Sequence, residues 1–446
     1  MNKLDSALVT SALKDTGFAL AETVKEADIV LINTCSVRLH AEQRVLSHLG
    51  HLKHIKETRP ELIVGVIGCM AQRLGTELLD HEAVDIVCGP AQIPQIPDLV
   101  NRALKDKTKL LSVADNIRRK CSDRQSDALD AFETAYDSDE NQIPHQAFVR
   151  VMRGCNNFCS YCVVPYVRGP EISRPPHTII EQIKKLADRG VKQITLLGQT
   201  INSYNWPGPD KTYRLADILQ MANDVEGIKW IRFITSYPLG FDESILHAMF
   251  DLPKVCPYLH IPAQSGSDKI LKAMNRRYTV SQYLNLLAKA RGIVDGIAIA
   301  GDFIVGFPGE TEADFAATVD LVKKADYKNC FVFKYSPRPS TRADDKLADS
   351  VPAEVKKQRN IELLEVQNRI SGEYNKRFLG QTLEVLAEGP SKKPNLDSAE
   401  PTGRPQLIGR TATDYIVVFN GPVSLAGEFA KVKITKVSPL TLFGKL

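Results

Sequence analysis

Between residues 145 and about 340, short apolar runs alternate with longer amphipathic stretches. The runs that read as strands are Ala147–Met152, Gln193–Leu197, Trp230–Thr235, Tyr258–Ile261, Ile297–Val305 and Phe331–Tyr335. Stretches of helical periodicity such as Ile179–Arg189 and Val280–Arg291 separate them. This repeat predicts a parallel β/α barrel, and here an incomplete one. Active-site groups of such barrels lie at the carboxyl ends of the strands.

Three cysteines follow the first of these predicted strands, in the run Arg153-Gly-Cys-Asn-Asn-Phe-Cys-Ser-Tyr-Cys-Val-Val-Pro165. Iron–sulfur clusters that serve electron transfer use four cysteines, so Cys155, Cys159 and Cys162 would leave one iron of a four-iron cluster open. Radical S-adenosylmethionine enzymes chelate their cofactor at such an iron, and Tyr161 also fits their pattern. The alternatives are three buried thiols, or a zinc site, which usually shows a second C-x2-C pair that does not follow here.

The composition is that of an ordinary globular protein. Of 446 residues, 43% are hydrophobic and 25% are charged, which allows two or three domains with sizeable cores. No apolar stretch approaches a membrane span, and the N-terminus has no basic-then-apolar signal pattern. Nine cysteines without such a signal predict a reducing, cytoplasmic compartment. A net charge of +4 permits a nucleic-acid partner without requiring one.

Further regions flank the predicted barrel, which takes up most of residues 144–375. Residues 1–115 alternate helical patterns with buried-strand patterns and predict a small open α/β domain; those strand patterns are Ala27–Asn33 and Leu62–Gly68. Residues 116–143 are polar and acidic, so we expect a linker there. Residues 376–446 hold short β-rich runs with Gly and Pro turns, which predict a small OB-like antiparallel barrel.

Along its whole length the chain resembles the methylthiotransferase family of radical S-adenosylmethionine enzymes, and within it the tRNA-modifying MiaB type. Segments similar to that family occur in order: Asn33-Thr-Cys-Ser-Val-Arg38, Gly68-Cys69, Val163-Val-Pro-Tyr-Val-Arg-Gly169, Leu196-Leu-Gly-Gln199, Leu259-His-Ile-Pro-Ala-Gln-Ser-Gly266, Asp302-Phe-Ile-Val-Gly-Phe-Pro-Gly-Glu310 and Tyr335-Ser-Pro-Arg338. The last predicted barrel looks like the family's TRAM module, with a match at Gly409-Arg-Thr411. Each segment alone is modest support, whereas all of them in order are close to diagnostic.

The resemblance implies a reaction and its cofactors. Enzymes of this type add a methylthio group to C2 of an isopentenylated adenosine beside the tRNA anticodon, where the C2–H bond is too strong for acid–base chemistry. They use S-adenosylmethionine for both the radical and the methyl group, and they hold two [4Fe-4S] clusters, of which the auxiliary one supplies sulfur. The implied partners are the tRNA anticodon loop, an electron donor of flavodoxin or ferredoxin kind and cluster-assembly proteins, and we expect a monomer.

Cys35 and Cys69 match two of the three auxiliary-cluster cysteines of this family. Each follows a predicted strand, so both are expected at the same carboxyl edge of the sheet, although two lone cysteines are more often packing residues. The family's third ligand lies in a Gly-Cys-Gln-Met-Asn segment that this sequence matches only from its methionine onward. Two explanations stand: a start assigned too late, which we expect, or an auxiliary site of two cysteines. An upstream reading frame that encodes Gly-Cys-Gln after an apolar strand would support the first.

Five residues just beyond predicted barrel strands are candidate contacts of S-adenosylmethionine: Gly198, Gln199, Ser236, Asp302 and Gly306. Tyr161, beside the cluster cysteines, is a sixth. Backbone groups and small polar side chains at these positions could meet the carboxylate, ribose or adenine of the cofactor. The alternative is that Gly, Gln and Ser simply end strands there.

Basic residues are the candidate contacts for RNA. Arg168 and Arg174 flank the cysteine loop, and Arg410 stands in the last predicted barrel; each could meet a phosphate, although a lone surface arginine usually has no specific partner. The lysines of that barrel favour RNA more strongly, because OB-like folds bind single-stranded or looped RNA. They are Lys431, Lys433 and Lys436.

Other functions compete with this interpretation. Sister enzymes act on threonylcarbamoyladenosine at the same tRNA position or on an aspartate of a ribosomal protein. The segments Val163–Gly169 and Leu196–Asn202 look more like the isopentenyladenosine branch. A non-catalytic iron–sulfur protein that binds RNA is a rival of another class, and a single-cluster radical methylase is a third. Only an enzyme would release 5′-deoxyadenosine when it is reduced and given tRNA.

Overall fold

The computed structural model describes residues 1–36, 39–115, 123–136, 145–392 and 405–446. They form two compact units, each built from segments that are far apart in the sequence. Unit 1 comprises Met1–Asp139, Met152–Gln182 and Ser336–Lys346, and unit 2 comprises Glu140–Val151, Ile183–Tyr335 and Leu347–Leu446. Within the described ranges, no helix has both the length and the hydrophobicity needed to cross a membrane.

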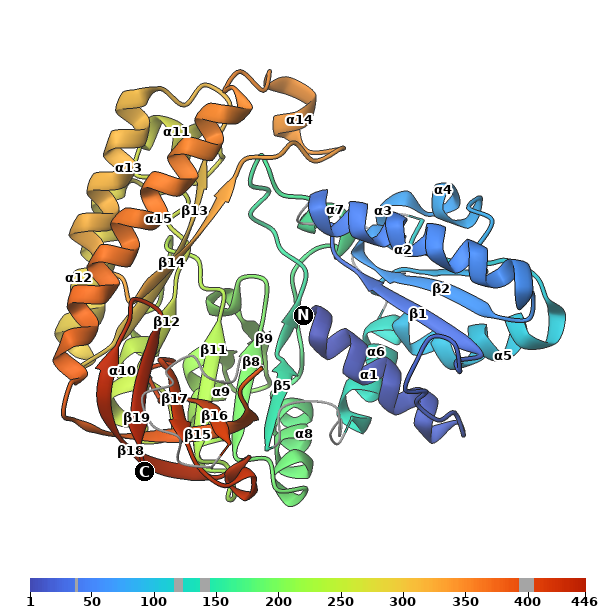
Figure 1. The fold of residues 1–446 in the computed structure, drawn as a ribbon, viewed down its shortest axis with the longest axis horizontal. Helices are drawn as coiled ribbons and strands as arrows, with labels where there is room; N and C mark the ends of the chain where they lie inside the picture. Colours follow the sequence, from blue (N-terminus) through green and yellow to red (C-terminus); the bar gives the residue numbers. More distant parts are fainter. Residues whose placement is uncertain (37–38, 116–122, 137–144, 393–404) are drawn as a thin grey trace. The chain divides into compact units, whose positions relative to one another are not determined.

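Unit 1 contains a four-stranded parallel sheet in the order β1-β2-β3-β4 (Figure 1). Its strands are β1 (Ile29–Thr34), β2 (Ile63–Gly68), β3 (Ile86–Cys88) and β4 (Leu110–Ser112), and its main helices are α1 (Asn2–Asp15), α2 (Leu39–Thr58), α3 (Cys69–Leu74) and α5 (Ile96–Asp106). Side chains of α2 and α3 pack on one face of the sheet, and those of α1 and α5 pack on the other. All six residues of β2 are therefore buried, and each large apolar one contributes about 1.5–3 kcal/mol. The predicted open α/β domain is confirmed.

The segment predicted as a linker contains a helix, α6 (Asp123–Ala135). Its carboxylates at Asp130 and Glu133 are buried and form ion pairs with Arg153 and Arg174, at distances of 2.6 to 3.3 Å. The composition suggested a linker because the segment lacks the broad apolar stripe by which most helices are recognised. A helix that is held by ion pairs to distant arginines does not need such a stripe. The part of the segment that the structure describes is thus packed against the fold.

Unit 2 contains the half-barrel, whose strands are all parallel within their sheets. They are β5 (Gln146–Arg150), β8 (Gln193–Leu197), β11 (Trp230–Ile234), β12 (Tyr258–His260), β13 (Ala298–Val305) and β14 (Asn329–Lys334). The strands pair in the orders β5-β8-β11 and β12-β13-β14, and β11 lies beside β12. The predicted incomplete barrel is confirmed, and each strand begins and ends within two residues of the predicted bounds.

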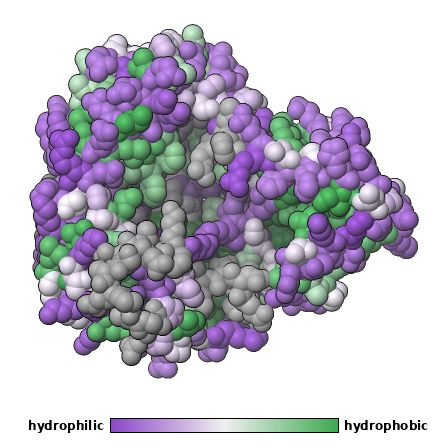
Figure 2. Space-filling view, in the orientation of Figure 1, coloured by the Kyte–Doolittle hydropathy of each residue, from purple (hydrophilic) through white to green (hydrophobic). Residues whose placement is uncertain are grey.

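Helices cover the outside of the half-barrel. They include α9 (Leu215–Asn223), α10 (Ser244–Asp251), α12 (Val280–Ile293), α13 (Glu312–Ala325) and α15 (Ala353–Asn375). On the face shown in Figure 2, the outer surface of α12, α13 and α15 is largely hydrophilic. Such helices place their apolar side chains against the sheet and their charges in water. This arrangement leaves the other face of the strands for the interior of the half-barrel.

The C-terminal part of unit 2 is a closed barrel in the order β15-β16-β17-β19-β18. Its strands are β15 (Thr382–Pro390), β16 (Gln406–Arg410), β17 (Ile416–Asn420), β18 (Phe429–Val437) and β19 (Thr441–Lys445). The predicted OB-like barrel is confirmed, except that β17 and β19 pair in parallel. Its apolar core continues into the half-barrel through Tyr258, Ala298 and Ala300.

A buried charged cluster reinforces this contact inside unit 2. Asp414, between β16 and β17, forms ion pairs with Arg232 at 3.3 Å, Lys328 at 3.0 Å and Arg410 at 3.0 Å. Arg232 lies on β11 and Lys328 directly precedes β14, so Asp414 ties the C-terminal barrel to both sheets of the half-barrel. Burial lowers the pKa of Lys328 to about 8, although the Asp414 carboxylate opposes this shift.

Candidate functional site

The cysteine loop is closed at its base by a short antiparallel pair, β6 (Met152–Arg153) with β7 (Ile172–Ser173). Next to this pair, the Cys155 N–H donates a hydrogen bond to the Gly169 carbonyl at 3.1 Å, which also holds the two ends of the loop together. Gly154 adopts a φ of +71°, and a Cβ there would lie 1.9 Å from the carbonyl oxygen of the residue after Gly169. Only glycine permits this close approach, so the sequence itself sets where the cysteines start.

The three cysteines of the loop are reduced thiols, of which Cys159 is buried and Cys155 and Cys162 are half-buried. The Cys162 N–H donates to the Cys159 carbonyl at 3.0 Å, and the Asn157 amide donates to the Cys155 sulfur at 3.5 Å. Among the described residues, no three His, Cys, Asp or Glu side chains converge as they would around one metal ion. A four-iron cluster places each thiolate on a different iron and does not need that convergence. The donor set therefore fits a cluster.

The segment after the cysteines packs against the first helix that follows β2. Val163 precedes helix α7 (Val164–Val167), and Val167 is its last residue. Both form an apolar cluster with Cys69. The next residue, Arg168, donates to the Asp5 carboxylate of α1 at 2.6 Å. Burial raises the pKa of the Cys69 thiol, and the Arg168 charge opposes this. The cysteine loop and the N-terminal sheet are thus packed together within unit 1.

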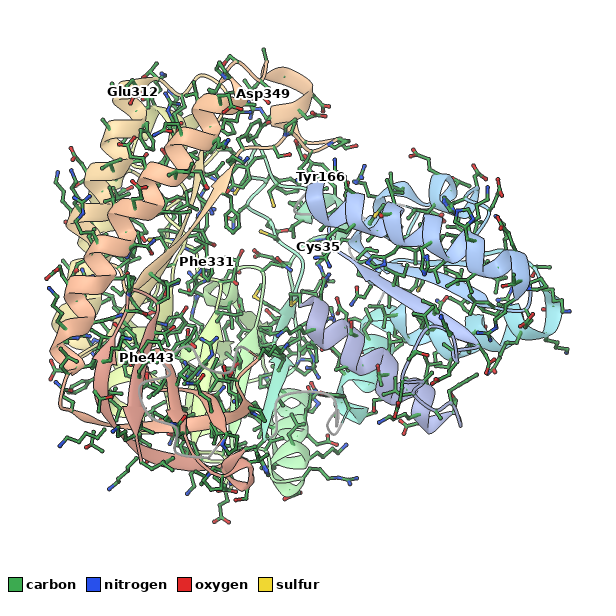
Figure 3. The ribbon with its side chains drawn as sticks, viewed as in Figure 1. Cys35, Tyr166, Glu312, Phe331, Asp349 and Phe443 are labelled. Carbon is green, nitrogen blue, oxygen red and sulfur yellow. The ribbon has the colours of Figure 1, made fainter. Side chains whose placement is uncertain are left out.

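Cys35 and Cys69 follow paired positions of neighbouring strands, because Thr34 of β1 lies opposite Gly68 of β2. Figure 3 shows Cys35 at the carboxyl end of β1. The Thr34 hydroxyl ties the two strand ends through hydrogen bonds of 2.7 and 3.1 Å to backbone groups at the end of β2 and in α3. Beside Cys35, the Ser36 hydroxyl is buried and has no partner among the described residues. The structure brings the two cysteines to one edge of the sheet, and an unsatisfied hydroxyl adjoins them.

In unit 2, Gly198 and Gln199 follow β8 directly, and Ser236 lies two residues beyond β11. Ser236 is 3% exposed; its N–H donates to the His260 carbonyl at 3.1 Å, and its hydroxyl has no partner among the described residues. Buried hydroxyls are nearly always hydrogen-bonded, so an unsatisfied one at the carboxyl end of a barrel strand fits a bound polar ligand. Gly198 is buried and Gln199 is half-buried at the same end of the half-barrel.

Tyr161, within the cysteine loop, is half-buried. The last two cofactor candidates, Asp302 and Gly306, have partners within the protein. Asp302, on β13, lies 3.2 Å from the Nε2 of His260 on β12. The Gly306 N–H donates to the Glu310 carboxylate at 2.6 Å, and Glu310 in turn pairs with Arg359 at 2.8 Å. The sequence reasoning missed His260 as a site residue. If the two predicted strands are placed side by side with alternate residues facing inward, His260 and Asp302 fall on the same face. This alignment would have identified His260.

The three arginines predicted to contact RNA are engaged in ion pairs. Arg174 has no exposed surface, Arg168 is buried and Arg410 is about one-third exposed. Their respective partners are Asp130 with Glu133, Asp5, and Glu388 with Asp414. In this arrangement Arg174 holds the fold together and has no surface to offer to a phosphate. Lys431 and Lys433, on β18, are exposed.

Known proteins resemble the chain over its whole length. Residues 149–322 match the Radical SAM superfamily, residues 1–89 match the uncharacterized protein family UPF0004, and residues 376–446 match the TRAM domain. The tRNA-2-methylthio-N(6)-dimethylallyladenosine synthase of Rhodopirellula baltica is 42% identical over 448 residues, which is 100% of this chain and 93% of that protein. The protein of the same name from Acetivibrio thermocellus is 41% identical over 100% of this chain and 88% of that protein.

Solved structures show the same fold at low sequence identity. The radical S-adenosylmethionine methyltransferase TsrM from Kitasatospora setae, with tryptophan substrate and a cofactor analogue bound, has a TM-score of 0.55 and 14% identity. The match covers 90% of this chain and 77% of that chain. At this identity the likeness concerns the fold alone.

Proposed function

Because the chain belongs to the family of tRNA-2-methylthio-N(6)-dimethylallyladenosine synthases, which are radical S-adenosylmethionine enzymes, we propose that it adds sulfur and a methyl group to C2 of an N6-dimethylallyladenosine in tRNA. The observation that carries the proposal is the cysteine loop. It presents three reduced thiols in C-x3-C-x2-C spacing on a closed scaffold. A fourth cysteine would complete an electron-transfer cluster, and the loop has none.

Cys155, Cys159 and Cys162 would hold the cluster that binds S-adenosylmethionine. When bound, that cluster supplies the electron that cleaves S-adenosylmethionine to a 5′-deoxyadenosyl radical. The Asn157 amide donates to the Cys155 sulfur and would stabilise it as a thiolate. The unsatisfied Ser236 hydroxyl offers a hydrogen bond to a polar group of the cofactor, and Gly198 and Gln199 offer backbone groups.

Cys35 and Cys69 would hold the auxiliary cluster. Support for this comes from their placement after paired residues of β1 and β2, and from the Ser36 hydroxyl beside them. The nearby Arg168 charge opposes the rise in the pKa of the Cys69 thiol and thereby favours its ligating thiolate form. The packing of α7 on Cys69 would keep this site at a fixed distance from the cysteine loop, since both belong to unit 1.

The RNA partner would be a tRNA, bound in part by the C-terminal barrel. The TRAM match and the exposed Lys431 and Lys433 on β18 support this assignment, because phosphate contacts supply most of the affinity for RNA. A reductant of flavodoxin or ferredoxin kind and cluster-assembly proteins stay predictions from the resemblance.

The test compares the chain with its Cys155→Ala/Cys159→Ala/Cys162→Ala variant after anaerobic reconstitution. Two clusters correspond to about eight irons in the chain and about four in the variant. Given S-adenosylmethionine, a reductant and tRNA that carries N6-dimethylallyladenosine, the chain should release 5′-deoxyadenosine and yield a methylthio nucleoside by mass spectrometry. Full iron loading without either product would refute the proposed activity and favour a non-catalytic RNA-binding protein.

A further inference from the structure

The strands of the half-barrel present two faces, and one of them carries unusual residues. On β13 and β14, Phe303 and Cys330 are buried toward the helices, and the Phe303 ring contacts that of Tyr327 at 5.8 Å. Side chains alternate along a strand, so the residues at the intervening positions face the interior of the half-barrel. On this inner face, Asp302 of β13 lies directly opposite Phe331 of β14. The next pair along, Ile304 and Phe333, lies on the same face.

Two phenylalanines on this inner face are solvent-exposed. Phe331 is 50% exposed and Phe333 is 39% exposed, although inner positions of a barrel are normally filled by other side chains. Figure 3 shows Phe331 on the side of β14 away from α15. The C-terminal barrel packs on the same face nearer the beginning of β13, at Ala298 and Ala300. The apolar cluster formed there does not include either phenylalanine. Unit 2 therefore presents two exposed aromatic rings on the inner face of the half-barrel.

A polar pair adjoins these rings. The His260 ring meets the Phe331 ring edge-to-face, with 6.4 Å between centroids, and its Nε2 lies 3.2 Å from the Asp302 carboxylate. Because a carboxylate only accepts, the Nε2–H is the donor of this bond. The Nδ1 of His260 has no hydrogen-bond partner among the described residues. The surface thus combines aromatic rings with a hydrogen-bonding group that is held in place.

We propose that this inner face, made of His260, Asp302, Phe331 and Phe333, binds the N6-dimethylallyladenine base of the substrate. The inference rests on the proposed function, which supplies the identity of the base. That base is planar, with an apolar branched group at N6 and polar ring atoms, so it needs an aromatic surface, an apolar surface and a hydrogen-bonding group together. Bases that leave an RNA loop are commonly stacked on aromatic side chains. Phe331 provides the stacking surface, Phe333 meets the dimethylallyl group and His260 Nδ1 reaches a polar edge.

Equilibrium binding to anticodon stem-loop RNA tests this assignment on the reconstituted chain without reductant. Two RNAs that differ only in the dimethylallyl group are compared by fluorescence anisotropy. Phe331→Ala should weaken binding of the dimethylallyl RNA about 5-fold or more, the effect of losing one stacked base. Phe333→Ala should lower the preference for the dimethylallyl RNA over the unmodified one. Phe250→Ala is the matched control, because Phe250 is 60% exposed on the outer helix α10 and should leave both affinities unchanged.

The outcomes separate this inference from the proposed function. If Phe331→Ala and Phe333→Ala both bind the two RNAs as the wild type does, the inference is overturned, even if the wild type makes the methylthio product. A wild type that prefers the dimethylallyl RNA but makes no product would refute only the proposed activity. Weaker binding of S-adenosylmethionine with unchanged RNA preference in Phe331→Ala would instead assign the face to the cofactor and overturn the inference. Phe331→Leu keeps the apolar contact without a ring, and it should lose the same affinity with an unchanged midpoint of thermal unfolding.

Discussion

Asp5 and Arg168 form a buried ion pair with 2.6 Å between guanidinium nitrogen and carboxylate oxygen. The Asp5 side chain has no exposed surface and that of Arg168 is 7% exposed. Asp5 lies in the first turn of α1, and Arg168 directly follows α7, so the pair joins segments 163 positions apart in the chain. Because the Arg168 charge also opposes the rise in the pKa of the Cys69 thiol, this ion pair bears on both the cysteine loop and the proposed auxiliary site.

Asp5→Asn should strongly destabilise the cluster-free chain. The substitution keeps the shape of the side chain but leaves the buried guanidinium without its counter-charge, which typically costs about 3–5 kcal/mol. Urea titration measures the free energy of unfolding. The control is Asp98→Asn, which removes the exposed pair Asp98–Arg102 and should cost about 0.5 kcal/mol or less. Similar small losses in both variants would show that Asp5 does not neutralise a buried charge.

The family and the fold could be read from the sequence because both depend on local patterns. Alternating strands and helices predicted the half-barrel, and the ordered motifs predicted the family that full-length relatives now confirm. Ion pairs between distant segments could not be read in this way. Helix α6 looked like a polar linker and Arg174 looked like a surface residue, because the partner of each lies elsewhere in the chain. Acidic and basic side chains, which composition alone places on the surface, here pair with each other inside the fold.

The interior of the half-barrel shows the same limit. His260 and Phe331 lie in predicted strands, but only the register of β12, β13 and β14 places them on one face beside Asp302. The sequence could supply the strands, whereas the inward or outward direction of each side chain depends on which face the helices cover. The exposure of Phe331 likewise depends on where the C-terminal barrel stops packing, which is a tertiary property.

Cys69→Ser should lower the iron content of the reconstituted chain by about four irons, because it removes a proposed ligand of the auxiliary cluster. Cys88→Ser is the matched control. Cys88 is fully buried at the end of β3, where burial raises its pKa to about 12, and it packs in the core. Iron and sulfide analysis with absorption spectra measures the loading. If both variants load as the parent chain does, Cys69 is a packing residue as well.

Arg174→Met should leave the salt dependence of tRNA binding unchanged. Each lysine or arginine that contacts a phosphate adds nearly one unit to the slope of log affinity against log salt, and the guanidinium of Arg174 is instead paired inside unit 1. Lys431→Ala/Lys433→Ala should reduce the slope, because both lysines are exposed on the C-terminal barrel. Filter binding at several salt concentrations measures the slopes. A reduced slope in Arg174→Met alone would assign RNA contact to that arginine.

The Lys328–Asp414 pair predicts a pH dependence of stability with a defined sign. Burial lowers the pKa of Lys328 to about 8 from its ordinary 10.5, so between these values the unfolded chain binds more protons than the folded one. The free energy of unfolding therefore rises with pH through this window, by up to about 3 kcal/mol for this group. Below pH 8 the lysine is protonated in both states, and its contribution stays constant.

Lys328→Met removes this titration and keeps Asp414 paired with Arg232 and Arg410. Near pH 7 we expect the variant to be as stable as the parent chain or more stable, because it no longer buries a charged amine. From pH 8 to about pH 10 the parent chain should gain on it in the midpoint of thermal unfolding. Asp414→Asn, in contrast, leaves the buried Arg232 and Lys328 without their shared carboxylate and should be the less stable variant throughout. Parallel pH profiles for the parent chain and Lys328→Met would mean that the lysine titrates as it does in water.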